Sequence, residues 1–445
     1  MKKLRARPGL HDAEAGMSII EVIAALMVFS VITLGMTAAL GTMAKLTRDD
    51  RGREVALGLA SQEIDKVRAV GDAFDVTNDE DQTQTVDGVT YTIDRTTQWV
   101  STDGSTATCG GSGGNLQYKR VDVRVTWPNM AMLKGPVESD TLLAPASRIN
   151  DPSYGTIIVS VLGADGTGRA GVTVTVKSSA GVAVTPIDAT DADGCSYVLK
   201  VTPGIYTVSV TKTGYIDYTQ ATTPSQSNLQ VTAGTTLPVG FQYDQAATFL
   251  PKLAPGFTGT PKLPDALKVN LISTRGVDSI SASASSATLY PASGGYAAVA
   301  GDTYTSTTSA APTCVDDDPV SWDAGTVNGV ALAAGERQPA SLAPGATGPL
   351  PIPLGVVQVT TDGSTTKLYA RTTTAPSGTG DPGCATAASY TYSGLKANTT
   401  YTLALPFGSW IIDKTSTGSG MSVTPLTTGE LTGKVVTLDP RGPAS

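Results

Sequence analysis

The sequence predicts an α+β fold: a long N-terminal helix packs on a small antiparallel sheet, and tandem all-β sandwich domains follow. Two observations predict it. Near the N-terminus, an apolar run without charges passes into a stretch with helical periodicity. Further along, short segments of alternating apolar and polar residues are separated by turns rich in Gly, Pro, Ser and Asp. The length of 445 residues indicates two or three domains.

The apolar run extends from Val22 to Ala44, 23 residues without a charge. As a helix rising 1.5 Å per residue it would be about 34 Å long, enough to cross the core of a bilayer. A secretory signal peptide has a shorter apolar core that ends in a cleavage site, so this run favours a membrane span. Four basic residues precede the run and four follow it closely, which leaves the orientation of the span weakly defined.

Helical periodicity continues after the run. Apolar residues recur at steps of three and four, and Gly71 is a plausible stop. We expect one helix over residues 17–71, with residues 17–45 in apolar surroundings and the second half on a sheet. Alternating segments at 85–100 and 118–127 predict the strands of that sheet, in a small head over 72–145. The apolar positions of the second half are Ala56, Leu59, Ala60, Ile64 and Val67.

The residues before the apolar run, Gly16-Met17-Ser18-Ile19-Ile20-Glu21-Val22, resemble the start of a type IV prepilin. The resemblance implies that residues 1–16 are a leader peptide, which prepilin peptidase removes by cutting after Gly16. It also implies that Met17 becomes an N-methylated N-terminus and that Glu21 is the acid at the fifth mature position. Many members of the family have Phe in place of Met17. The helix at 51–71 resembles that of V-type minor pilins and of I-type pseudopilins of type II secretion.

The chemistry of Glu21 supports this interpretation, because a carboxylate at the end of an apolar helix needs a partner in lipid. When such helices pack together, the α-ammonium of a neighbouring Met17 can neutralise Glu21 and set the register of assembly. The alternative is that Glu21 lies at the level of the lipid headgroups.

Downstream, residues 146–154 carry two prolines without apolar periodicity, which predicts a linker. Residues 155–245 form the clearest β module, with turns at Asp193-Gly194 and Pro203-Gly204. This module resembles the carboxypeptidase regulatory-like domain, which implies a seven-stranded transthyretin-like sandwich without catalytic activity. Residues 255–440 predict one large or two small β-sandwiches.

Composition excludes several classes of function. The single histidine, His11, lies in the leader, so a mature chain would lack imidazole for Ser-His-Asp catalysis or histidine metal sites. The net charge of −8 argues against a nucleic-acid partner, and loss of the +2 leader would make it −10. We expect no enzyme activity and no cofactor.

Four cysteines, without CxxC spacing, predict disulfides. Cys314 and Cys384 lie in loops of the same region, and we expect them to pair. Cys109 and Cys195 then either bridge the head to the β module or stay unpaired. The sequence alone leaves all three connectivities open.

Two acidic stretches are candidate cation sites. They are Asp79-Glu80-Asp81 and the denser Asp316-Asp317-Asp318. For both, a solvated acidic loop is the expected structure, and we assign no metal ligand.

Together these features predict a minor type IV pilin, at the tip of a pilus as an adhesin or as a subunit that primes assembly. Its expected partners are prepilin peptidase, other pilin subunits through the N-terminal helix, the cytoplasmic membrane before assembly, and a surface or carbohydrate ligand. One alternative is a pseudopilin of a secretion or DNA-uptake system. Another is a membrane-tethered protein that binds carbohydrate or acts as an enzyme through paired carboxylates.

Overall fold

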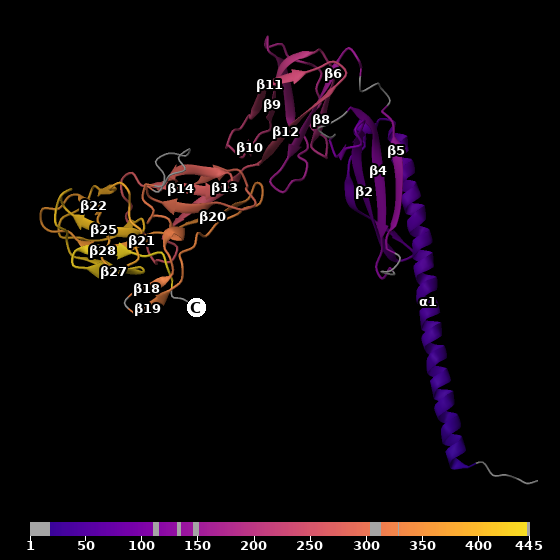
Figure 1. Ribbon diagram of the computed structural model, residues 1–445, viewed down its shortest axis with the longest axis horizontal. Coiled ribbons are helices and arrows are strands. Elements are labelled where there is room, and N and C mark those ends of the chain that lie inside the picture. Colours follow the sequence, from indigo (N-terminus) through magenta and orange to yellow (C-terminus); the bar gives the residue numbers. More distant parts are fainter. Residues whose placement is uncertain are drawn as a thin grey trace, which may run out of the picture. The chain divides into compact units, whose positions relative to one another are not determined.

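The computed structural model describes residues 18–109, 115–130, 135–145, 151–302, 313–327 and 329–442. The chain divides into two compact units (Figure 1). Unit 1 comprises Met1–Val100 and Gln117–Ser147, and unit 2 comprises Ser101–Leu116 and Arg148–Ser445. The predicted α+β class, with one long helix and β-sandwich domains, is confirmed.

Unit 1 begins with helix α1 (Ile19–Val70), which has 52 residues. The helix ends where the sequence predicts, because Gly71 adopts the left-handed conformation that caps a helix C-terminus. The short 3₁₀ helix η1 (Ala73–Asp75) then leads into the sheet. The predicted helix start at residue 17 lies outside the described residues.

The sheet of unit 1 has the strand order β1-β2-β4-β5, and its members are β1 (Asp79–Val86), β2 (Val89–Ser101), β4 (Leu116–Thr126) and β5 (Val137–Leu143). The sequence predicted β2 and β4. It predicted a solvated loop for Asp79-Glu80-Asp81, and this was wrong because these residues start β1. The side chains of β1 are mostly exposed. An edge strand held mainly by backbone pairing to β2 needs no apolar alternation, so the sequence pattern does not reveal it.

The core of unit 1 lies between the second half of α1 and the sheet. Figure 1 shows α1 running along β5 and continuing well beyond the end of the sheet. The helix contributes one apolar stripe, and the strands contribute alternate residues from their inner faces. The central members of this core are Ala56, Leu59, Ala60, Ile64, Val67, Tyr91, Ile93, Val121, Val123 and Val125.

Unit 2 contains a two-sheet sandwich over residues 155–245, with its own core of Val, Ile and aromatic side chains. One sheet has the order β10-β12-β6-β8 and the other β11-β9-β7. Its strands are β6 (Gly155–Leu162), β7 (Thr173–Ser178), β8 (Cys195–Val201), β9 (Gly204–Thr211), β10 (Tyr215–Asp217), β11 (Ser225–Val231) and β12 (Thr236–Gln245). Strands β12 and β6 pair in parallel.

The rest of unit 2 shares one large core over several small sheets. The main sheets are β16-β13-β20, β15-β14-β17, β24-β21-β26 and β23-β22-β25-β28-β27, with a β18-β19 hairpin and the 3₁₀ helix η2 (Pro319–Ser321). The strands are β13 (Ala247–Leu253), β14 (Lys268–Ser273), β15 (Gly276–Ser281), β16 (Ala287–Leu289), β17 (Ala297–Ala300), β18 (Gly325–Val327), β19 (Val330–Leu332), β20 (Thr347–Ile352), β21 (Gly355–Thr360), β22 (Leu368–Thr372), β23 (Ser389–Tyr392), β24 (Thr400–Leu405), β25 (Gly408–Asp413), β26 (Val423–Pro425), β27 (Gly429–Thr432) and β28 (Val435–Leu438).

Candidate functional site

The first half of α1 carries the residues that the sequence singled out for assembly. Glu21 lies in the first turn of the helix and is exposed. Among the described residues, no basic side chain forms an ion pair with it. Gly16 and Met17, the predicted cleavage and methylation positions, lie outside the described residues.

Between Ile19 and Leu46 the helix exposes its large apolar side chains to solvent, and Phe29, for example, is 67% exposed. This is the one helix in the described part of the chain that is long and apolar enough to cross a membrane. Its hydroxyl side chains donate to the backbone carbonyl four residues earlier, so they bring no unsatisfied donor into an apolar environment. These residues are Ser30, Thr33, Thr37 and Thr42.

The second half of α1 is fixed to its sheet by a buried carboxylate. Glu63 is 1% exposed and accepts bonds from Arg95 of β2 at 2.5 Å and from Lys66 at 2.9 Å. Burial acts to raise the pKa of Glu63, but the two cations outweigh it and the pKa falls below its ordinary value. Arg95 also donates to the carbonyl of Thr77 at 2.9 Å, so the guanidinium is held from two sides.

Two disulfides are present in unit 2. One joins Cys109 to Cys195, the first residue of β8. Cys109 belongs to the segment Ser101–Leu116, which lies between β2 and β4 in sequence and carries the short strand β3 (Thr106–Ala107). Of the two outcomes that the sequence leaves open for these cysteines, the paired one is found, and Cys109 is only 6% exposed because the disulfide holds it against the sandwich. In the same segment, the Asn115 amide donates to the carbonyl of Gly234 at 2.6 Å.

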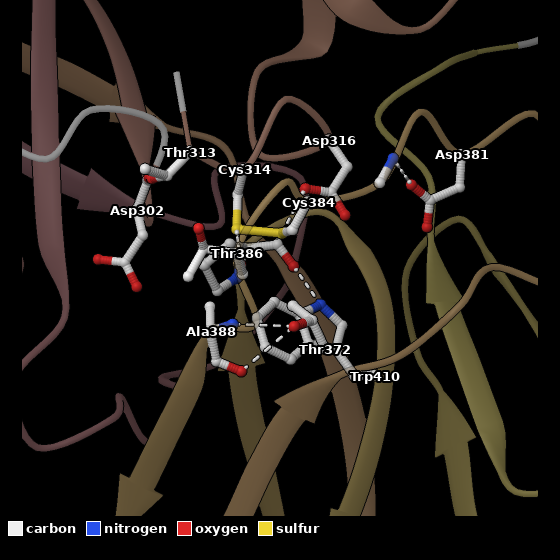
Figure 2. The surroundings of a disulfide bond; sticks show 12 residues. Asp302, Thr313, Cys314, Asp316, Thr372, Asp381, Cys384, Thr386, Ala388 and Trp410 are labelled. Carbon is white, nitrogen blue, oxygen red and sulfur yellow. Dashed lines mark hydrogen bonds between the residues drawn. A yellow bond between two sulfur atoms is a disulfide. The ribbon is translucent and has the colours of Figure 1, made fainter. Parts of the chain in front are cut away.

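The second disulfide, Cys314–Cys384, lies beside a group of buried acids (Figure 2). Asp316, Asp317 and Asp318 are all less than 5% exposed, so the expected solvated loop was wrong here too. The reason is Trp322, which is fully buried and donates its indole N–H to the carbonyl of Asp316 at 2.8 Å. This anchor draws the acidic segment into the core.

The three acids differ in their surroundings. Asp318 accepts bonds from the guanidinium of Arg337 and caps η2 through the backbone N–H of Val320. Asp316 forms no ion pair with a described Lys or Arg, and its Oδ1 lies 3.2 Å from the Cys384 sulfur. Burial and the nearby carboxylate of Asp381 raise the pKa of Asp316 to about 7.

Asp317 is 2% exposed, and no cation pairs with its carboxylate among the described residues. Burial raises its pKa well above the ordinary value, and the charges of Asp316 and Asp302 raise it further. The backbone of Asp302 lies beside the carboxylate and acts to lower its pKa. A Cβ at Gly301 would clash with the Asp317 carboxylate, and one at Gly408 would clash with that of Asp316. Both glycines have φ near +120°, so the backbone leaves room for the two acids.

The remaining two acids of this group come from other parts of unit 2. Asp302 accepts a bond from the Tyr390 hydroxyl at 3.1 Å, and Asp381 accepts bonds from Ser409 at 2.6 Å and from the backbone of Gly383 at 2.7 Å. In Figure 2 Asp302 and Asp381 lie on opposite sides of the disulfide. Among the described residues, the group of three metal-ligand types within 4.8 Å is Asp316 with the two cysteine sulfurs. These sulfurs are bonded to each other, so they offer no thiolate.

Sequence reasoning found Asp316 and Asp317 but missed Asp302 and Asp381. Each of these two is a single acid in a loop without a local pattern, and only the tertiary fold brings them near the acidic segment. Glu63 could have been noticed, because it falls on the apolar stripe of α1, between Ala60 and Val67.

No protein-family model and no curated protein sequence matches this chain. Among solved structures it is similar to the TIE protein of Bacillus anthracis, at 12% identity over 78% of this chain and 69% of that one, with a TM-score of 0.19. It is also similar to BcpA, the major pilin subunit of Bacillus cereus, at 13% identity over 64% and 95% of the two chains, with a TM-score of 0.19.

A third similar structure is the pilus adhesin SpaC from Lactobacillus rhamnosus GG, at 12% identity over 80% of this chain and 49% of that one, with a TM-score of 0.15. These solved structures therefore include a pilin subunit and a pilus adhesin. Their low TM-scores carry no argument for this chain, so its function has to be argued from its own residues.

Proposed function

We propose that this chain is a minor type IV pilin. In this proposal, prepilin peptidase cuts after Gly16 and the new N-terminal Met17 is N-methylated. Before assembly the chain is a single-pass protein of the cytoplasmic membrane. It then joins a surface pilus, in which α1 packs against the helices of other subunits. Its β domains, including the carboxypeptidase regulatory-like module at 155–245, act in adhesion or in priming of assembly, and they perform no catalysis.

The observation that carries the proposal is the placement of the Gly16–Val22 motif directly before an exposed apolar helix. Within the described part of unit 1, the first half of α1 exposes its apolar side chains, whereas the second half is buried on a sheet. A helix that exposes this much apolar surface favours membrane lipid or the helices of other subunits as its surroundings. Both are surroundings that a pilin occupies in turn.

Glu21 has a defined role in this proposal. In an apolar environment its carboxylate needs a counter-charge, and the α-ammonium of Met17 on a neighbouring subunit supplies one. The large β region after residue 145 supports a terminal position, because such a bulk on every subunit would crowd a tightly repeating shaft.

The test is mass spectrometry of the protein isolated from cells. The expected N-terminus is Met17, about 14 Da heavier than the unmodified residue because of one methyl group. In cells without prepilin peptidase, the protein should keep residues 1–16 and stay in the membrane. An N-terminus elsewhere in the presence of the peptidase would contradict the proposal.

Immunogold electron microscopy then separates assembly from mere anchoring. Glu21→Ala should remove the protein from pili while leaving it processed and membrane-bound. Glu54→Ala, which changes an exposed acid in the second half of α1, should leave pilus incorporation unchanged. Equal incorporation of both variants would refute the role of Glu21, and gold at secretion complexes instead of pili would favour a pseudopilin.

A further inference from the structure

Units 1 and 2 are joined by more than one stretch of chain. The chain leaves unit 1 after Val100, returns at Gln117 and leaves it again after Ser147. The stretch between the first two points, Ser101–Leu116, belongs to unit 2. Unit 2 is therefore connected to unit 1 at the end of β2 and at the start of β4, as well as after β5.

The segment Ser101–Leu116 is fixed to the two-sheet sandwich of unit 2 by a covalent bond. Cys109 and Cys195 form a disulfide, and their side chains are 6% and 2% exposed. Cys195 begins β8 and pairs with Ser160 of β6, so the disulfide ends on a strand that is hydrogen-bonded within the sandwich. A pull on the sandwich is therefore transmitted through the disulfide to β2 and β4.

The connections enter unit 1 at strands that are held differently. In the order β1-β2-β4-β5, the strands β2 and β4 each have a neighbour on both sides. Strand β5 is the last strand of this described sheet, and it pairs with β4 over the seven residues Val137–Leu143. A pull on β2 or β4 has to break two hydrogen-bond ladders, whereas a pull on β5 breaks one.

The connection through the disulfide is also the shorter one along the chain. Cys109 lies eight residues after Ser101, the last residue of β2. Gly155, the first residue of β6, lies 12 residues after Leu143, the last residue of β5. Fully extended, these stretches span at most about 29 Å and about 43 Å. If the longer stretch is loaded first, β5 yields and lengthens it further, so the load passes to the disulfide.

We propose that the segment Ser101–Leu116 and its Cys109–Cys195 disulfide form the load-bearing connection between the two units. The chain between β5 and β6 is then not needed for mechanical strength. The need for such a connection rests on the proposed function, because a pilus that holds α1 and a surface that binds unit 2 would pull the chain from two sides. Along the covalent path the load passes from β2 through the disulfide to β8, and residues 110–194 lie outside this path.

The test pulls single molecules of the full chain in detergent, held by peptide tags at the two ends. A protease recognition sequence replaces residues 146–150, so that the chain between β5 and β6 can be cut in the folded protein. The measured quantity is the force at which unit 1 unfolds, and unit 1 is recognised by the chain length that its unfolding releases. Cut molecules should stay linked and should unfold at the same force as uncut ones. Separation of cut molecules, or a lower force, would overturn the proposal.

Cysteine variants measure what the disulfide contributes. In the double variant Cys109→Ser/Cys195→Ser, cut molecules should come apart. Uncut molecules should unfold unit 1 at a lower force and extend by about 280–310 Å more, because a sequence separation of 86 residues joins the loaded path. An unchanged force in this variant would show that the disulfide bears no load.

The matched control is Cys314→Ser/Cys384→Ser, which removes the other disulfide of unit 2. Its cut molecules should stay linked, and unit 1 should unfold at the wild-type force. The cut protein with all four cysteines tests the proposal even if a cysteine variant does not fold. None of these outcomes depends on cleavage after Gly16, so they test the connection separately from the proposed function.

Discussion

Glu63 in unit 1 and Asp317 in unit 2 are equally buried acids with opposite surroundings. Glu63 lies between Arg95 and Lys66, and its pKa is lowered. Asp317 pairs with no cation in the described part of the chain, and its pKa is raised. Burial alone therefore does not reveal the purpose of a carboxylate. The acid that pairs with cations fastens a helix to a sheet, whereas burial disfavours the charge of the acid that pairs with none.

The largest loss of stability should come from replacing Arg95, the cation that pairs with buried Glu63. Arg95→Leu leaves a buried carboxylate with only the half-exposed Lys66, and should lower the free energy of unfolding of unit 1 by about 3–5 kcal/mol. Urea unfolding followed by hydrogen exchange of peptides from unit 1 measures it. The control is Arg120→Leu, which breaks an exposed pair with Asp122 and should cost less than about 1 kcal/mol. Equal losses would show that Glu63 needs no partner.

Changing the partnered acid itself should cost less. Glu63→Gln keeps the shape and some hydrogen bonding but loses the charge that neutralises Arg95. We expect a loss of about 1.5–3 kcal/mol in the unfolding free energy of unit 1, measured in the same way. A neutral result would mean that the ion pair only balances its own desolvation, as some buried pairs do.

The two units should respond to pH in opposite directions. Because the pKa of Glu63 is lowered, its contribution is complete above its ordinary pKa and disappears as the pH falls through the folded value. Because the pKa of Asp316 is raised to about 7, unit 2 should lose stability as the pH rises from about 4 to 7. The expected slope is about 1.4 kcal/mol per pH unit for one such group. Hydrogen exchange of unit 1 at pH 3 and 5 and of unit 2 at pH 5 and 7 tests the two signs, and slopes of the same sign would contradict the comparison.

The smallest effect should come from Asp317. Asp317→Asn replaces a buried carboxyl whose pKa is raised by an amide of similar shape, so at pH 5 the unfolding free energy of unit 2 should change by less than about 1 kcal/mol. The same substitution type at Glu63 costs more, which makes the two variants a matched pair. A loss above 3 kcal/mol at Asp317 would reveal a structural partner.

Much of the fold follows from periodicity in the sequence. The apolar stripe that predicts α1 is the stripe that packs on the sheet, and alternation identifies β2 and β4 in unit 1. The sequence does not predict strand β1, because its side chains are mostly polar and exposed and backbone pairing to β2 holds it in place. The alternation of apolar and polar residues along a segment shows which of its side chains are buried. An edge strand buries few side chains, so it shows little alternation.

The candidate sites were less predictable. Glu21 is identified by its position next to an apolar run, a signal that lies wholly within the sequence. The acid group of unit 2 is a product of tertiary structure. An acidic triplet predicts a solvated loop on composition alone, and the burial of Trp322 reverses that expectation. No local sequence pattern links Asp302 or Asp381 to the acidic segment Asp316–Asp318.

The hydroxyls along the first half of α1 have one more consequence. Since Ser30, Thr33, Thr37 and Thr42 already donate within the helix, they gain and lose no hydrogen bond when the helix leaves one apolar medium for another. No residue from Val22 to Ala44 carries a charge, so in the proposed transfer from lipid to other subunits Glu21 is the side chain of this segment that has to exchange one electrostatic partner for another.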